Sequence, residues 1–271
     1  MASSWTRLET SKKRLQIRWD YPVPIGEEVL DLKSVLKEIR GRDPRPLIVL
    51  RDCDSCKGKD DALLSRTLGN EKTLLLTQWF HCIKLDRRVL EKSHPYHILF
   101  SGEKPPHLFL MSWDGSIRMD LNGKQSQKKL WMSMRKVLKA DYKKDALVAA
   151  RNWLRILDRF DIFDSQEKNL STQLDRLLGK KGKAKKIKAL EAKLAKLKKE
   201  REAAFKKEQD LINLVLKHAP KKRTVADFDA ESADEVKASG GGGLLDKIRK
   251  GKGEAKNASG TKPKGALGTG H

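Results

Sequence analysis

The feature that most constrains the fold is one short, almost wholly apolar run, Pro46-Leu47-Ile48-Val49-Leu50. A strand without polar alternation has both of its faces buried, so other elements must cover the sheet on both sides. The preceding residues 27–39 place apolar side chains at three- and four-residue steps, which predicts an amphipathic helix that Gly41 and Pro44 end. This pairing of a buried strand with a helix predicts an α/β fold.

The rest of residues 1–142 continues the alternation of strands and helices. Asp114-Gly115 predicts a hairpin turn between two late strands. Parallel pairing of the early strands and antiparallel pairing of the late strands give a mixed sheet with helices on both faces. The expected strands are 15–19, 46–50, 73 toward 83, 105–111 and 117–121, and the expected helices are 27–39, one after residue 56 that includes 63–68, and one from about 126 to 138.

Beyond residue 142 the pattern becomes helical and then loses structure. Residues 143–161 continue as a helix, and Ala184–Lys217 places Leu190, Leu194 and Leu197 at heptad positions. Arg201 and Glu208 interrupt this seam, so a helical hairpin and a weak coiled coil both remain open. The Gly- and Lys-rich remainder predicts disorder. We therefore expect three regions: 1–142, 143–218 (helical, basic, a possible coiled coil) and 219–271 (a disordered tail).

The chain carries a formal net charge of +23, and residues 180–207 contain thirteen Lys or Arg against three Glu. Such a stretch either binds a polyanion, such as nucleic acid or an acidic protein, or is simply the solvent-exposed face of a helix. The sequence shows no signal peptide and no apolar stretch long enough to span a membrane. We expect a cytoplasmic protein.

The chemistry-bearing motif is Cys53-Asp54-Ser55-Cys56, which follows the buried strand directly. The amino terminus of a following helix would stabilise a thiolate on Cys53, and Cys56 would resolve the mixed disulfide. Lys57 adds positive charge nearby. A zinc site built from these two cysteines with His81 and Cys82 is disfavoured, because neighbouring residues of a strand point to opposite faces.

Two segments together resemble the thioredoxin family. Leu47–Lys57 is similar to that family's strand, Cys-x-x-Cys and helix, and Pro106-His107-Leu108-Phe109-Leu110 is similar to its proline-opened strand. The resemblance implies a thioredoxin-like fold without a cofactor. It also implies a cis proline that shapes the substrate groove, which maps to Pro106 or, failing that, Pro105.

The chain departs from the family pattern around the cysteines. Asp52 precedes the pair and Asp54 lies within it, and both carboxylates oppose thiolate formation. The family's buried acidic residue, six positions before the first cysteine, is Leu47 here. Two functions therefore stay open: thiol–disulfide exchange on protein substrates, and a non-catalytic adaptor whose basic helices bind an acidic protein or nucleic acid.

Overall fold

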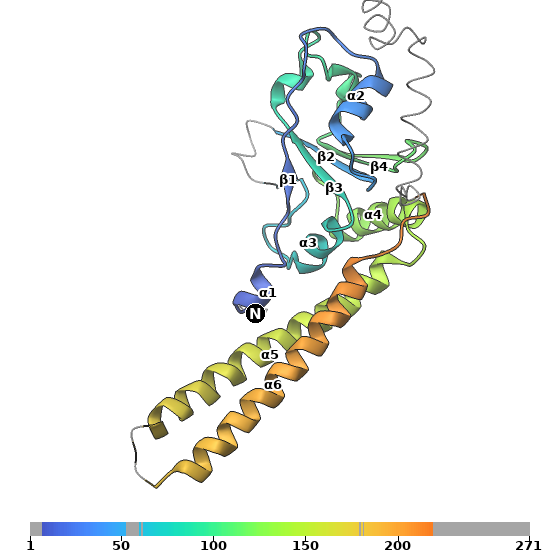
Figure 1. Ribbon diagram of the computed structural model, residues 1–271. Helices are drawn as coiled ribbons and strands as arrows, with labels where there is room; N and C mark the ends of the chain where they lie inside the picture. The colour runs from blue at the N-terminus through green and yellow to red at the C-terminus, as the bar shows by residue number, and fades with distance from the viewer. Residues whose placement is uncertain (1–6, 53–59, 61, 179, 181, 219–271) are drawn as a thin grey trace, which may run out of the picture. The chain divides into compact units, whose positions relative to one another are not determined.

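Five strands form a single mixed sheet in the order β1-β3-β2-β4-β5 (Figure 1). The computed structural model describes residues 7–52, 60, 62–178, 180 and 182–218. β1 and β2 pair in parallel with β3, whereas β4 pairs antiparallel with β2 and β5 antiparallel with β4. The expectation of parallel pairing early and antiparallel pairing late is confirmed. The strands are β1 Trp19–Asp20, β2 Leu47–Arg51, β3 His81–Leu85, β4 Leu108–Met111 and β5 Arg118–Leu121.

One face of the sheet is covered by α2 and two short 3-10 helices. α2 spans Leu32–Arg40, η2 spans Arg87–Leu90 and η3 spans His97–Phe100. Their apolar residues pack on alternate residues of the central strands, such as Leu47 and Val49 of β2. The N-cap Asp31 accepts a hydrogen bond from the Lys33 N–H, which explains why α2 begins later than residue 27.

The opposite face carries the larger hydrophobic core. It is covered by α3 (Glu71–Thr77), α4 (Gln127–Asp141) and the first half of α5 (Ala146–Leu178). Ile48 and Leu50 of β2 point into this core, as does Cys82 of β3. Trp153 and Phe160 of α5 belong to the same cluster. The start of the helical extension is therefore a layer of the sheet's own core.

α5 and α6 (Ala184–Ile212) form a helical hairpin (Figure 1). The two residues that interrupt the heptad seam both make ion pairs there. Arg201 Nη2 lies 2.7 Å from Asp164 Oδ1, and Glu208, which is 1% exposed, binds Arg14 through both carboxylate oxygens. Glu208 Oε1 also accepts from the Trp153 indole at 2.8 Å. Of the two arrangements left open for this region, the structure has the hairpin.

An N-terminal segment that includes α1 (Glu9–Lys12) lies along α5. Arg7 forms a bidentate pair with Glu71 at 2.7 Å and also contacts Asp161 at 2.8 Å. These carboxylates raise the pKa of Arg7 above its ordinary value, against the effect of burial. Arg14 lies over the Phe160 ring, 4.7 Å from its centroid. Charge therefore fixes this segment to the hairpin.

Three expected elements are wrong. Of the strand expected at residues 15–19 only Trp19 is extended, because β1 spans Trp19–Asp20. Residues 73–77 belong to the helix α3 instead of a strand, and only His81–Leu85 is extended. Residues 62–69 form turns instead of a helix. There the Asn70 side chain accepts from the Ser65 N–H and donates to the Ser65 carbonyl, which offers the backbone an alternative to helical bonds.

Candidate functional site

The proposed reactive residues Cys53 and Cys56, together with Lys57, lie outside the described residues. The structure does describe Asp52 before them and Asp60 after them. It also describes the segment expected to lie beside them, Pro105 and Pro106, which is half-buried at the start of β4. The candidate site is therefore built from these flanking residues.

Main-chain hydrogen bonds place the end of β2 between β3 and the start of β4. The Arg51 N–H donates to the His107 carbonyl at 3.0 Å, and the Asp52 N–H donates to the Leu85 carbonyl at 2.9 Å. Arg51 Nε lies 3.5 Å from the Pro106 carbonyl oxygen. The structure thus brings Pro106 next to the residues from which the chain runs into Cys53. The described residues contain no cis peptide bond, so Pro106 lacks the cis bond that the resemblance implies.

A nearly buried lysine on β3 joins the two flanks of the cysteine segment. Lys84 Nζ lies 3.3 Å from Asp52 Oδ1 and 3.2 Å from Asp60 Oδ1, and its side chain is 9% exposed. The other carboxylate oxygen of Asp60 accepts from the Trp19 indole at 3.0 Å. Burial lowers the pKa of Lys84, but the hydrogen bond and charge of Asp60, with those of Asp52, outweigh it and raise the pKa above its ordinary value.

Lys84, Asp60 and Trp19 were not singled out from the sequence. The available signal was Lys84 itself, the only charged residue in the otherwise apolar strand end Cys82-Ile83-Lys84-Leu85. A charge on a buried strand requires a counter-charge. Asp60 gave no signal, because it lies in a polar stretch next to another aspartate.

His107 and Arg51 complete the polar groups at this edge. Burial lowers the pKa of His107, and the charge of Arg51 lowers it further, so the imidazole is neutral at pH 7. Gly123 has a φ of 84°, and a Cβ there would lie 3.2 Å from the His107 ring nitrogen. This glycine lets the loop after β5 approach the ring closely.

Cys82, the remaining cysteine, is a core residue. It is 2% exposed, its thiol is free, and burial raises its pKa to about 12. It points into the larger core, whereas His81 precedes it on the strand and approaches Asp20 at 3.1 Å. Among the residues that the structure describes, no three His, Cys, Asp or Glu side chains converge as a metal site.

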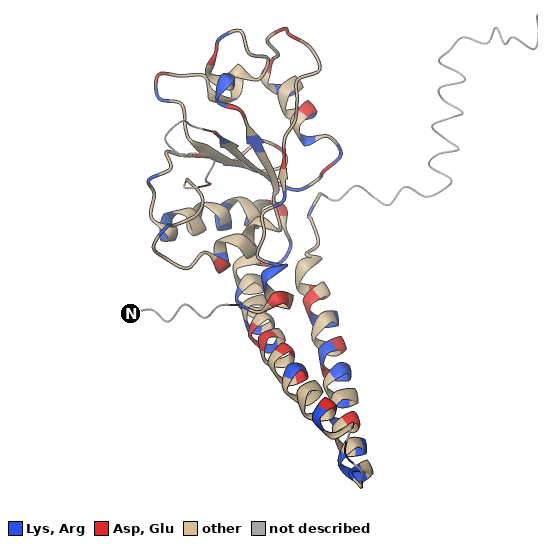
Figure 2. Cartoon of the chain, turned by 90° about the vertical axis from the view of Figure 1, so that its left-hand side faces the viewer, with Lys and Arg blue, Asp and Glu red and all other residues tan. Residues whose placement is uncertain are grey.

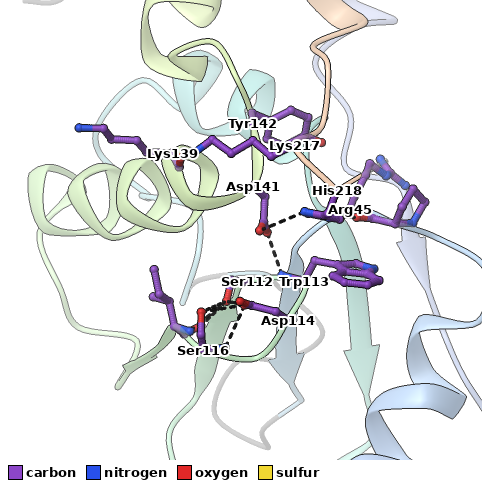
Figure 3. A network of polar contacts seen from close by, with 12 residues as sticks. Arg45, Ser112, Trp113, Asp114, Ser116, Lys139, Asp141, Tyr142, Lys217 and His218 are labelled. Carbon is purple, nitrogen blue, oxygen red and sulfur yellow. Dashed lines mark hydrogen bonds and ion pairs between the residues drawn. The ribbon is translucent and has the colours of Figure 1, made fainter. Parts of the chain in front are cut away.

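A second polar cluster lies where α4 ends and the chain leaves α6 (Figure 3). Asp141 accepts from the Trp113 N–H at 2.8 Å and lies 3.8 Å from His218 Nδ1. The His218 ring stacks on Trp113 with centroids 4.4 Å apart, and its Nε2 approaches the Pro44 carbonyl at 3.2 Å.

The same cluster contains serines, an aspartate and a histidine, but these are not arranged as a catalytic triad. Ser112 and Ser116 donate their hydroxyls to Asp114 at 2.7 and 2.8 Å, which lowers the pKa of Asp114 to about 2. His218 Nε2 approaches a main-chain carbonyl instead of a serine. These contacts hold the segment that follows α6 against the turn between β4 and β5.

The fold and site define a mixed α/β protein with a helical hairpin built into its core. Comparison with family models, with curated proteins and with solved structures gives no match. None of the helices in the described part of the chain is both long enough and apolar enough to cross a membrane.

Proposed function

We propose that the protein carries out thiol–disulfide exchange on protein substrates through Cys53 and Cys56. The observation that carries this proposal is the adjacency of Arg51 and Pro106 across β2 and β4. Cys53 follows the end of β2 by two residues, and Pro106 precedes β4 by two. The strand order β1-β3-β2-β4-β5, with antiparallel β4 and β5, supports a thioredoxin-like sheet.

The reaction requires two thiols and conserves electrons. The Cys53 thiolate attacks one sulfur of a substrate disulfide, and the other substrate sulfur leaves as a thiolate. The Cys56 thiolate then attacks Cys53 in the mixed disulfide, which releases the second substrate thiol and oxidises the pair to a disulfide. A dithiol reductant restores the two thiols.

Lys84 has a defined electrostatic role in this proposal. Carboxylates beside a cysteine favour the thiol over the thiolate. The Lys84 ammonium is nearly buried and pairs with both Asp52 and Asp60. Its positive charge offsets the effect of these two carboxylates, which would otherwise disfavour a thiolate in the cysteine segment between them. Arg51 adds a second positive charge at the end of β2. A polypeptide substrate would lie against Pro106, with Pro105 before it.

The test is reduction of insulin by dithiothreitol with the wild type, Cys53→Ser and Cys82→Ala. The wild type and Cys82→Ala accelerate reduction equally, because Cys82 is buried in the core. Cys53→Ser matches the uncatalysed rate. Equal rates with and without the wild-type protein would contradict general disulfide reduction, and full activity in Cys53→Ser would contradict the role of Cys53.

A further inference from the structure

The net positive charge of the α5–α6 hairpin lies in the half that is away from the sheet. Residues 146–165 and 201–212 contain six Lys or Arg and six Asp or Glu, so the half next to the sheet is neutral. Residues 166–200 contain twelve Lys or Arg against four Asp or Glu. Figure 2 shows the two charge types mixed near the sheet and Lys and Arg prevailing at the far end.

Four of the six acidic residues of the neutral half are engaged in ion pairs within the fold. Asp158 and Asp161 bind Arg7, Asp164 binds Arg201, and Glu208 binds Arg14. These pairs hold the N-terminal segment and α6 onto α5. The excess lysines of the far half are therefore not needed to balance the hairpin's internal charges.

Within α6, one exposed face is composed of lysine and alanine. The buried seam passes through Leu190, Leu197 and Ala204. On the other side, lysines recur at helical spacing with only small side chains between them, and Lys196 also contacts Glu200 at 4.0 Å. The exposed residues of this face, from the far end inward, are Lys185, Lys188, Ala189, Ala192, Ala195, Lys196 and Lys199.

We propose that this lysine–alanine face binds the phosphate backbone of double-helical nucleic acid without sequence preference. The face runs from Lys185 to Lys199, about 21 Å at 1.5 Å per residue, and a duplex presents one phosphate charge per about 1.7 Å of its axis. Alanine between the lysines lets a rod-shaped polyanion approach the helix closely.

The side chains of α6 favour a duplex over a single strand. Single-strand binding without sequence preference combines basic grooves with aromatic platforms for the bases. The only aromatic residue of α6 is Phe205, and it packs against Phe160 with centroids 4.8 Å apart. Lysine is a flexible point charge that suits phosphates, and contacts to phosphates carry no base-sequence information. This inference is independent of the cysteine chemistry.

The test is fluorescence anisotropy of a labelled 20-base-pair DNA duplex titrated with the full chain at about 50–200 mM salt. Four phosphate contacts predict a loss of affinity of about 10²-fold over this range. The variant Lys185→Gln/Lys188→Gln/Lys196→Gln/Lys199→Gln loses most of the affinity at 50 mM salt, at least about 30-fold, and its salt dependence becomes shallow. Exposed Lys→Gln changes preserve helix propensity, which circular dichroism verifies.

The matched control removes the same charge from elsewhere in the described chain, with Lys33→Gln/Lys37→Gln on α2 and Lys128→Gln/Lys136→Gln on α4. It retains affinity within about threefold of the wild type, since these lysines lie outside the hairpin. Equal losses in the two variants would overturn the proposal in favour of unspecific attraction by net charge. Stronger binding of a labelled poly-glutamate peptide or of single-stranded DNA, or no duplex binding at 50 mM salt, would overturn it as well.

Discussion

At the scale of single residues, the described chain buries several charges and gives each a counter-charge or a hydrogen bond. Lys84 lies between Asp52 and Asp60, and Asp141 accepts a main-chain N–H. Removing one member of such a group costs more than the pair contributes, because the remaining charge stays desolvated. Single substitutions at these positions therefore reveal the contacts directly.

Lys84→Met lowers the free energy of unfolding by about 1–3 kcal/mol at pH 7. This loss in the free energy of unfolding is smaller than for a fully buried pair, because the Asp52 side chain is 44% exposed. Urea denaturation measures the change, and Lys92→Met, at an exposed position, serves as the control. If Lys84→Met unfolds at the same urea concentration as the wild type, the ion pairs contribute nothing to stability.

The pH dependence of this difference follows from the raised pKa of Lys84. A cation whose pKa is higher in the folded state stabilises the fold below its unfolded pKa of about 10.4 and loses that effect above its folded pKa. The gap between wild type and Lys84→Met is therefore constant from about pH 6 to pH 10 and narrows above that range. A gap that narrows between pH 6 and pH 8 would show that another group is responsible.

Asp141→Asn and Asp141→Ala have different consequences. Burial raises the pKa of Asp141, so its ionised form disfavours folding above that pKa, and the penalty disappears below about pH 3.8. Asn keeps an acceptor for the Trp113 N–H without the charge. The free energy of unfolding of Asp141→Asn therefore lies within about 1 kcal/mol of the wild-type value at pH 7. Asp141→Ala is destabilised by about 1–3 kcal/mol. Urea denaturation at pH 7 and pH 4 checks both, and equal losses for Asn and Ala would contradict this view of the hydrogen bond.

At the scale of elements, Glu208 connects three segments: the N-terminal segment, α5 and α6. Glu208→Ala removes the carboxylate that pairs with the Arg14 guanidinium and accepts from the Trp153 indole, and lowers the free energy of unfolding by about 3–5 kcal/mol. The double variant Arg14→Leu/Glu208→Leu recovers a large part of this loss, since no unpaired charge remains. Chemical denaturation measures both, with the exposed Glu202→Ala as a control expected within about 0.5 kcal/mol of wild type.

Element by element, the sequence was informative where a local signal agreed with burial. The Asp114-Gly115 turn, the start of a helix near residue 126 and the helix stop at Gly41 all stand where the patterns placed them. The error at α3 has a physical reason. Thr73, Leu75, Leu76 and Thr77 are all buried and no residue of α3 is fully exposed, so the sequence of this short helix does not alternate between an apolar and a polar face at the helical period.

The candidate site was less predictable than the sheet. Pro106 lies next to the strand that leads into Cys53, but it lacks the implied cis bond, and its role in substrate binding stays a prediction. The ion pairs of Lys84 could not be derived, because they join β3 to a loop residue through tertiary structure alone. The redox role of the cysteine pair stays a prediction, as does the cytoplasmic location.

At the scale of the whole molecule, the sheet and the start of the hairpin share one core. Residues 1–142 without α5 would expose Trp79 and the α3 leucines, which pack in the same cluster as Trp153 and Phe160. We expect a chain that ends at residue 142 to show poor amide dispersion in NMR spectra and no cooperative unfolding. A chain that ends at residue 219 should unfold cooperatively. Cooperative unfolding of the shorter chain would show that the sheet is stable without the hairpin.

The ion pair between Arg14 and Glu208 can form only late in the synthesis of the described chain. Its members stand 194 positions apart, the first near the start of the chain and the second near the end of α6. At a synthesis rate of about 5–20 residues per second, roughly 10–40 s pass between the appearance of Arg14 and that of its acceptor. During this interval the nascent N-terminal segment lacks the Glu208 partner of Arg14, so this ion pair forms only after α6 has been made, later than the pairs of Arg7 with Glu71 and Asp161 can form.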